Sequence, residues 1–278
     1  MASSKPEALI TMPTSSIPTR PGPAPGDSYV QSFARGLEVI RSFGNEAPRQ
    51  TITEVAERTG LTRAGARRIL LTLQTLGYVK SDGKLFRLTP RMLNLGFAYL
   101  SSLPIWNLAE PVMQALVEQT QESCSAAVLD GADIVYVLRV PTHKIMSITL
   151  GVGSRLPAYC TSMGRMLLSA LPQAELMRIL ETSERTARTR FTVTEVTELA
   201  AKIAQVRKQG WSQVDQELEE GLVSMAVPVI DRAGQTVAAL NISGQANRTS
   251  ARVMQETMLL PLLAAAQTIS RMLSVQRT

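Results

Sequence analysis

Three arginines near the start of one segment have the residue type and spacing to bind a polyanion. Arg63, Arg67 and Arg68 fall in the first two turns of a helix predicted over residues 62–76. Guanidinium groups can bind guanine edges or phosphates, and this part of a recognition helix enters a major groove. A solvated helix face would carry the same arginines, because arginine is a good helix former. The residues that we expect to meet DNA are Thr62, Arg63, Ala64, Arg67 and Arg68.

The segment that follows favours DNA binding over a merely solvated helix. Residues 78–88 predict two strands around the pair Asp82-Gly83, which is typical of a β-hairpin turn. Lys80 and Lys84 would lie on this hairpin, where they could position it on the DNA backbone or in a minor groove. A helix, a tight turn, a basic helix and a hairpin together predict a winged helix-turn-helix.

The positive charge of the chain is concentrated in the same region. The chain has a net charge of +6 at pH 7. Residues 28–91 contain eleven lysines and arginines against five acidic residues, whereas bases and acids balance over 1–27 and over 92–278. Concentrated positive charge indicates a polyanionic partner such as nucleic acid.

A second candidate site lies in the carboxyl-terminal half of the chain. Residues 156–165 lead from a loop into a helix that begins with two hydroxyl residues. Free backbone N–H groups and the positive end of the helix dipole favour a carboxylate there, although simple helix capping explains the same residues. Ser224, Asn241 and Ser243 lie on or beside apolar strands, and buried polar side chains need partners. Those partners are either backbone groups or a small polar ligand.

The composition argues against most metal and hydrolase chemistry. The single histidine, His143, cannot build the ligand sets of structural zinc, haem or iron–sulfur sites. Cys160 could be imagined as a nucleophile, but nothing in the sequence places His143 near it, and buried inert cysteine is commoner. We therefore expect no catalytic residue, no metal and no cofactor.

The chain has the features of a cytoplasmic protein without membrane contact. No apolar run approaches the ~18 residues that span a bilayer. The first 26 residues lack the apolar core of a secretory signal. Two cysteines, Cys124 and Cys160, cannot form a disulfide framework, so a reducing compartment fits best.

The length of 278 residues predicts two folded units rather than one. We expect a disordered tail over 1–27, which holds six of the fifteen prolines, and a winged helix-turn-helix over 28–90. Residues 91–103 predict a linker helix whose apolar side makes dimer contacts, and 104–278 a second domain.

Hydrophobic periodicity predicts the individual elements. Helices are expected at 28–43, 51–60, 62–76, 104–121, 162–171, 173–181, 194–209 and 250–273. Strands are expected at 125–129, 134–140, 145–150, 211–214, 224–230 and 237–242. Because the strands are grouped before and after helices, the second domain is predicted to be α+β with an antiparallel sheet.

Four stretches of the chain resemble the IclR family of bacterial transcription regulators. They are residues 32–40, 155–165, 214–222 and 238–243, and the likeness runs from about residue 29 to 273. The strings Tyr-Cys-Thr-Ser-Met-Gly-Arg and Val-Asp-Gln-Glu-Leu-Glu resemble the subgroup that regulates protocatechuate, 4-hydroxybenzoate and β-ketoadipate catabolism.

This resemblance implies a winged helix-turn-helix, a linker helix and a GAF-like effector-binding domain. The implied partners are double-stranded DNA with a palindromic operator, a second copy as homodimer or dimer of dimers, and RNA polymerase as a further candidate. The implied effector is a small organic acid such as protocatechuate, 4-hydroxybenzoate or β-ketoadipate. The positions that match the family's effector site are Ser162, Met163, Ser224, Asn241 and Ser243.

The sequence departs from the family at one acidic position of that site. The acidic position falls at Val214, one residue before Asp215. Either Asp215 substitutes through a small change of register, or the ligand loses that contact. We add Arg139 and Tyr159 as a cation and a phenol suited to an aromatic or dicarboxylic acid, although both could equally be structural.

The function predicted from the sequence is therefore regulation of aromatic acid catabolism by an acid-responsive DNA-binding protein. The main rival is a small-molecule enzyme with an incidental basic head. A third alternative is a constitutive DNA architectural protein without an effector.

Overall fold

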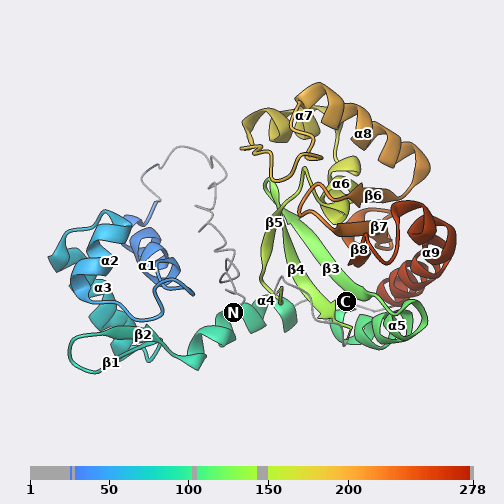
Figure 1. Cartoon of the computed structure of the whole chain (residues 1–278). Helices are drawn as coiled ribbons and strands as arrows, with labels where there is room; N and C mark the ends of the chain where they lie inside the picture. Colours follow the sequence, from blue (N-terminus) through green and yellow to red (C-terminus); the bar gives the residue numbers. More distant parts are fainter. Residues whose placement is uncertain (1–25, 27–28, 102–104, 143–149, 276–278) are drawn as a thin grey trace, which may run out of the picture.

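A small amino-terminal head and a larger carboxyl-terminal domain are joined by a helix in the computed structural model (Figure 1). The structure describes residues 26, 29–101, 105–142 and 150–275. Apart from Gly26 and Leu150, the predicted tail over 1–27 and the predicted strand over 145–150 lie outside the described residues.

Three helices and a hairpin form the head, as the sequence predicts. They are α1 (Gln31–Arg41), α2 (Ile52–Thr59), α3 (Arg63–Thr75), β1 (Val79–Ser81) and β2 (Phe86–Leu88). A capping box begins α2, because the Thr51 N–H donates to Glu54 Oε2 at 2.6 Å and the Glu54 N–H donates to Thr51 Oγ1 at 3.3 Å. Thr62 Oγ1 accepts the Gly65 N–H at 3.1 Å and begins α3. Local side-chain chemistry therefore sets where both helices begin.

The hairpin is tied to the next helix by a compact polar joint. The Thr89 N–H donates to Tyr78 O at 2.9 Å, and Thr89 Oγ1 donates to Gly77 O at 2.6 Å. The Arg91 guanidinium lies 5.5 Å from the centre of the Tyr78 ring, within the range of a cation–π contact. The one-turn helix η1 (Pro90–Met92) leads directly into α4 (Leu93–Ser101), so this joint fixes α4 to the head.

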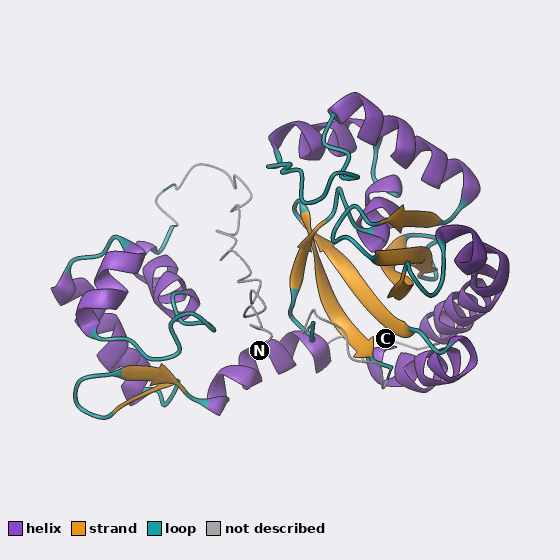
Figure 2. Ribbon diagram, in the orientation of Figure 1, coloured by secondary structure: helices purple, strands orange, loops and turns teal. Residues whose placement is uncertain are grey.

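A six-stranded antiparallel sheet organises the larger domain (Figure 2). Its strand order is β5-β4-β3-β8-β7-β6. The strands are β3 (Ser123–Asp130), β4 (Asp133–Val140), β5 (Arg155–Pro157), β6 (Ser212–Asp215), β7 (Leu222–Ile230) and β8 (Thr236–Gln245). The helices are α5 (Ile105–Thr120), α6 (Ser162–Ser169), α7 (Gln173–Thr182), α8 (Val196–Gln209) and α9 (Ala251–Val275). The α+β class and the antiparallel sheet are those that the sequence predicts.

Helices cover both faces of this sheet, and each face has its own apolar core. Leu240 and Ile242 of β8 pack in the core that α5 and α9 close. Ala239 packs in the other core, which α6, α7 and α8 close (Figure 1). Successive strand residues point to opposite faces, so Asn241, between Leu240 and Ile242, belongs to the α6 side.

Two local features differ from the sequence prediction. Residues 155–157, expected as a loop, form the edge strand β5, and Arg155 there binds Asp133 and Asp130. Three residues are too short for a periodicity signal, which explains the miss. The first helix begins at Gln31 after Val30 rather than at Ser28, which lies outside the described residues.

Gly164 is required by a close approach of two backbone segments. A Cβ at Gly164 would lie 2.2 Å from Ala158 O and 2.5 Å from Thr161 Oγ1. We therefore expect Gly164→Ala to lower the free energy of unfolding by about 3 kcal/mol through overpacking, measured by urea denaturation. The control is Gly36→Ala in α1, where nothing lies within 4 Å and alanine should stabilise by about 1 kcal/mol. Equal stability of the two variants would contradict this reading.

Candidate functional site

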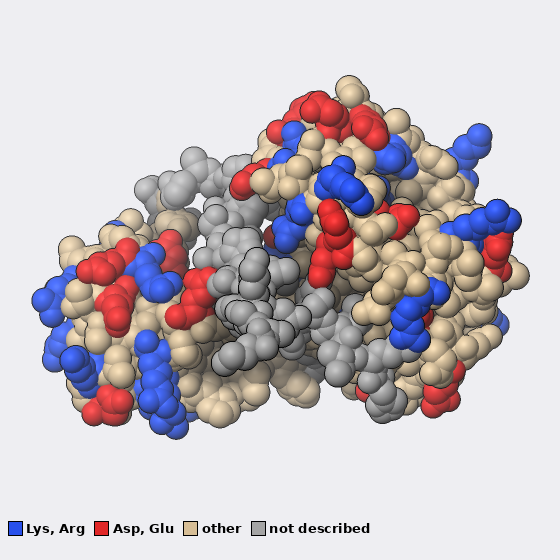
Figure 3. All heavy atoms as spheres, in the orientation of Figure 1, with Lys and Arg blue, Asp and Glu red and all other residues tan. Residues whose placement is uncertain are grey.

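The basic side of α3 is open to solvent. All seven residues predicted to meet DNA are exposed: Thr62, Arg63, Ala64, Arg67 and Arg68 on α3, and Lys80 and Lys84 on the hairpin. Within the described part of the chain, Arg63, Arg67 and Arg68 have no acidic partner. Lys and Arg side chains gather at the edge of the head that carries α3 and the hairpin (Figure 3). This surface is suited to a polyanion.

Packing on the other side of α3 holds this basic side outward. Ala66, Leu70 and Leu73 are buried in the core of the head with Val39 and Val55. Because these positions recur every three or four residues, the helix cannot rotate without exposing them. The orientation of the arginines is thus fixed by the apolar residues between them.

The hairpin carries one further cation that the sequence reasoning missed. Arg87 is exposed and pairs directly opposite Lys80 across β1 and β2. Like charges opposite each other destabilise a hairpin, and a polyanion relieves that repulsion. The alternation of β2, in which Phe86 and Leu88 point inward, is the sequence signal that could have identified Arg87.

A cavity lies between the amino end of α6 and the sheet, and we call it the α6 cavity. Its polar lining consists of Tyr136, Arg139, Cys160, Thr161, Ser162, Ser224, Asn241 and Ser243. Its apolar lining consists of Leu150, Met163, Val214, Leu218 and Leu222. Among these residues Arg139 is the one charged side chain and no carboxylate is present, so the cavity favours an anion.

Six of the eight residues predicted to bind the effector line the α6 cavity together. They are Arg139, Ser162, Met163, Ser224, Asn241 and Ser243. Ser224 of β7 pairs directly with Ser243 of β8, and Asn241 follows two residues away on the same face. The antiparallel register therefore brings together polar groups from distant parts of the chain.

A β-bulge aims Arg139 into the cavity. Ala126 pairs with Leu138 but Ala127 pairs with Tyr136, which leaves Val137 as an extra residue on β4. Strict alternation would place Tyr136 and Arg139 on opposite faces, whereas the bulge places both at the α6 cavity. Arg139 Nη1 also donates to Ser125 Oγ at 3.2 Å.

Ser162 offers an unused hydrogen-bonding group at the start of α6. Its side-chain hydroxyl is buried and has no hydrogen-bond partner among the described residues. Helix capping is performed by the preceding residue, because Thr161 Oγ1 accepts the Gly164 N–H at 3.2 Å. A buried unsatisfied hydroxyl costs about 1–3 kcal/mol, which a ligand acceptor would offset.

Two predicted effector residues lie outside the cavity lining. The Tyr159 hydroxyl donates to Thr186 O at 2.7 Å, which directs it away from the residues that line the cavity. Val214 faces the cavity and pairs with Ser224, whereas Asp215, the next strand residue, is exposed. No change of register brings Asp215 to the cavity, because adjacent residues of a strand point to opposite faces. An apolar side chain, that of Val214, therefore stands at the position where the resemblance implies an acid.

Cys160 and Tyr136, which line the cavity, stay protonated and neutral near pH 7. Burial raises the pKa of Cys160 to about 11, although the Arg188 charge opposes this, and burial raises the pKa of Tyr136 to about 12. A protonated thiol is a poor nucleophile, which agrees with the expectation of an inert Cys160. His143 lies outside the described residues.

The described residues contain neither a cluster of metal ligands nor a membrane-spanning helix. No group of three or more His, Cys, Asp and Glu side chains is placed to hold a metal ion there. Within the same ranges, no helix has the length and apolar character needed to cross a bilayer.

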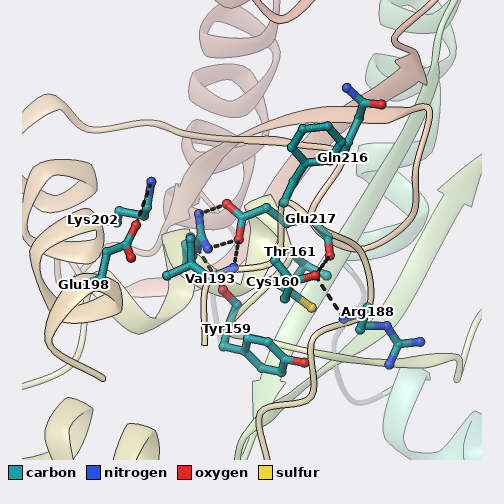
Figure 4. A network of polar contacts seen from close by, with 12 residues as sticks. Tyr159, Cys160, Thr161, Arg188, Val193, Glu198, Lys202, Gln216 and Glu217 are labelled. Carbon is teal, nitrogen blue, oxygen red and sulfur yellow. Dashed lines mark hydrogen bonds and ion pairs between the residues drawn. The ribbon is translucent and has the colours of Figure 1, made fainter. Parts of the chain in front are cut away.

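Beside the cavity lies a buried ion pair that sequence reasoning did not find. Arg165 Nη1 donates to Glu217 Oε1 at 2.7 Å, and Nη2 donates to Oε2 at 2.5 Å (Figure 4). The two residues are 3% and 7% exposed. The partners are 52 positions apart, so no local pattern could have paired them. Neither side chain lines the cavity itself.

Both domains of the chain match known protein families. The family model for the IclR helix-turn-helix domain matches residues 32–83, and that for the carboxyl-terminal domain of bacterial IclR transcriptional regulators matches 97–271. The Pca regulon regulatory protein of Pseudomonas putida is 41% identical over 96% of this chain and 98% of its own length. The p-hydroxybenzoate hydroxylase transcriptional activator of Acinetobacter baylyi is 35% identical over 85% of this chain and 89% of its own.

A solved structure extends the likeness to three dimensions. The crystal structure of a protein from Rhodococcus sp. RHA1, described as a transcriptional regulator, is 49% identical with a TM-score of 0.79. The match covers 88% of this chain and 98% of that one. These matches confirm the resemblance that the four sequence stretches indicated. The chain belongs to the IclR family of bacterial transcription regulators.

Proposed function

We propose that this regulator binds DNA through α3 and the hairpin and is controlled by an aromatic acid held in the α6 cavity. The observation that supports an acid ligand is the lining of this cavity: among the described residues it has one cation, no carboxylate and a buried Ser162 hydroxyl without a hydrogen-bond partner. The enzyme alternative is not favoured, because the family and the curated relatives are transcription regulators.

The carboxylate of the acid has two complementary groups in the cavity. Arg139 supplies a charge-assisted donor, and Ser162 at the start of α6 supplies a hydroxyl beside the positive end of the helix dipole. The apolar wall formed by Met163, Leu218 and Leu222 suits a ring or a short carbon chain. The names of the Pseudomonas putida and Acinetobacter baylyi relatives support a ring acid such as protocatechuate or 4-hydroxybenzoate, with β-ketoadipate as the open-chain candidate.

The DNA contact that we propose uses the exposed basic residues of α3 and of the hairpin. Arg63, Arg67 and Arg68 project from the exposed side of α3, where a major groove can accept the helix. Lys80 and Lys84 extend the positive surface along the hairpin. A palindromic operator follows if two heads are related by two-fold symmetry.

Dimerisation is the use that we propose for the exposed apolar side chains of α4. Leu93 is 74% exposed and Phe97 68%, and Phe33 of α1 is 67% exposed. Leu93 and Phe97 are four residues apart and so lie on one side of α4, and exposed apolar patches are typical of interfaces rather than of solvated helices. A dimer can adopt more than one arrangement of its subunits, and the acid would shift the equilibrium between them by binding one arrangement better than another.

Acid binding can be tested by calorimetry and thermal melting with protocatechuate, 4-hydroxybenzoate and β-ketoadipate. We expect one acid to raise the melting temperature, and Arg139→Met to weaken its Kd by roughly ten- to a hundred-fold, because a charged hydrogen bond contributes about 1.5–3 kcal/mol. Ser162→Ala should also weaken binding. Ser212→Ala is the matched control, since Ser212 Oγ is equally buried and unsatisfied but outside the cavity. No binding of any acid to the native protein would contradict the proposal.

DNA contact can be tested with the region upstream of the protein's own gene. Arg67→Ala should weaken operator binding by about 1–3 kcal/mol if the guanidinium reads a base edge. Arg67→Lys should restore affinity for a phosphate contact but not for a two-pronged base contact. Arg232→Ala, at an exposed arginine of the β7–β8 turn, serves as control. Unchanged affinity of Arg67→Ala in a gel-shift titration would refute the placement.

The dimer can be tested by sedimentation velocity. Phe97→Asp should convert the protein to a monomer, because a buried unpaired carboxylate opposes association. Val152→Asp, at an exposed apolar residue of a loop in the larger domain, should leave the oligomeric state unchanged. A dimeric Phe97→Asp protein would exclude this part of α4 from the interface.

A further inference from the structure

The outer wall of the α6 cavity is a loop that an ion pair holds in place. The loop joins β6 to β7 over residues 216–221 and brings Leu218 to the cavity, while Leu222 follows at the start of β7. Glu217, the neighbour of Leu218, is directed away from the cavity toward α6, where it meets Arg165. One residue thus anchors the loop while the next closes the cavity.

Glu217 is the point at which three segments meet (Figure 4). Its Oε2 accepts the Val193 N–H at 3.1 Å, and its backbone carbonyl accepts Thr192 Oγ1 at 2.6 Å. Arg165 Nε donates to Tyr159 O at 2.8 Å, which connects the pair to the turn before α6. The same turn provides Cys160 and Thr161 to the cavity lining.

The loop requires this anchor because its own backbone is strained. Gln216 has a φ of 60°, a left-handed conformation that non-glycine residues adopt at a cost. Its carbonyl accepts Thr189 Oγ1 at 2.7 Å, and its Oε1 accepts the Gly221 N–H at 3.0 Å. The contacts that fix the loop therefore come from outside it as well as from within.

We propose that Arg165 and Glu217 are positioning residues of the effector site, whose ion pair holds Leu218 over the α6 cavity and so sets the size of acid that fits. The proposal rests on the proposed function only for the identity of the ligand. A buried pair of this kind is weak evidence for stability, since apolar residues could fill the space equally well. The role that we propose for the ion pair is to hold the loop in one position, with Leu218 over the cavity.

The two cysteines of the chain provide a readout that needs no ligand. Cys160 lines the α6 cavity, whereas Cys124 is buried in the core on the other face of the sheet. If Leu218 moves outward, reagent reaches Cys160 but not Cys124. If the whole domain loosens, both thiols react faster.

The experiment measures iodoacetamide labelling of both cysteines in the full-length native protein by mass spectrometry. We expect Glu217→Gln to speed labelling of Cys160 by about ten-fold or more with no change at Cys124. Leu218→Ala should produce the same selective increase while the ion pair remains. Asp133→Asn is the matched control, because it breaks the Arg155–Asp133 pair outside the cavity and should leave both rates unchanged.

Three labelling results would overturn the proposal. They are an equal increase at both cysteines in Glu217→Gln, no increase at Cys160 in that variant, and no increase at Cys160 in Leu218→Ala. If Glu217→Gln does not fold, Arg165→Lys gives the same comparison, because lysine keeps the charge but cannot make the paired hydrogen bonds.

Acid selectivity provides the second arm. In the native protein, 4-hydroxybenzoate should bind more tightly than its bulkier 3-methoxy derivative, and Glu217→Gln should reduce that ratio of Kd values by about ten-fold. An unchanged ratio would also overturn the proposal. If the native protein binds no acid, the proposed function fails, whereas the labelling result still decides whether the pair positions Leu218.

Discussion

The alternation of side chains across the sheet is the constraint on which the larger domain depends. Each side chain of the central part of β7 and β8 points either to the face covered by α5 and α9 or to the face covered by α6. Ser224, Asn241 and Ser243 fall on the second side, where they line the α6 cavity, and Asn241 Oδ1 accepts the Ser125 N–H at 3.1 Å. The bulge at Val137 of β4 interrupts the alternation of that strand and adds the cation of Arg139 to that side. Register and bulge together therefore define the chemistry of the cavity.

Features set by near neighbours in the chain were predictable from the sequence. Thr51 with Glu54 and Thr62 mark helix starts through contacts three residues away, and the structure places both caps as expected. The bulge, the apolar wall at Leu218 and the pairing of Arg165 with Glu217 were not predictable. Each depends on which segments meet in space, and a single sequence does not contain that information locally.

The domain treats two buried polar groups in opposite ways. Each nitrogen of the Arg165 guanidinium donates a hydrogen bond, two of them to Glu217 and one to the Tyr159 carbonyl. The Ser162 hydroxyl, three residues earlier on the same helix, lacks any partner within the described ranges. Buried polar groups that have hydrogen-bond partners make the structure rigid. A buried group without a partner destabilises the unliganded protein, and a ligand that forms the missing hydrogen bond removes that cost. On α6, Arg165 therefore helps to hold the cavity in shape, whereas Ser162 is the group that we propose to bind the ligand.

The polar joint at Thr89 has a mechanical consequence. Hydrogen bonds to Gly77 and Tyr78, with Arg91 stacked on the Tyr78 ring, leave no free pivot between the hairpin and α4. The head and α4 must then move as one rigid body, which includes α3, the helix that we propose to contact DNA. In the DNA complex that we propose, a tilt of α4 would therefore also displace the three arginines of α3 and change the distance between the two heads of the proposed dimer.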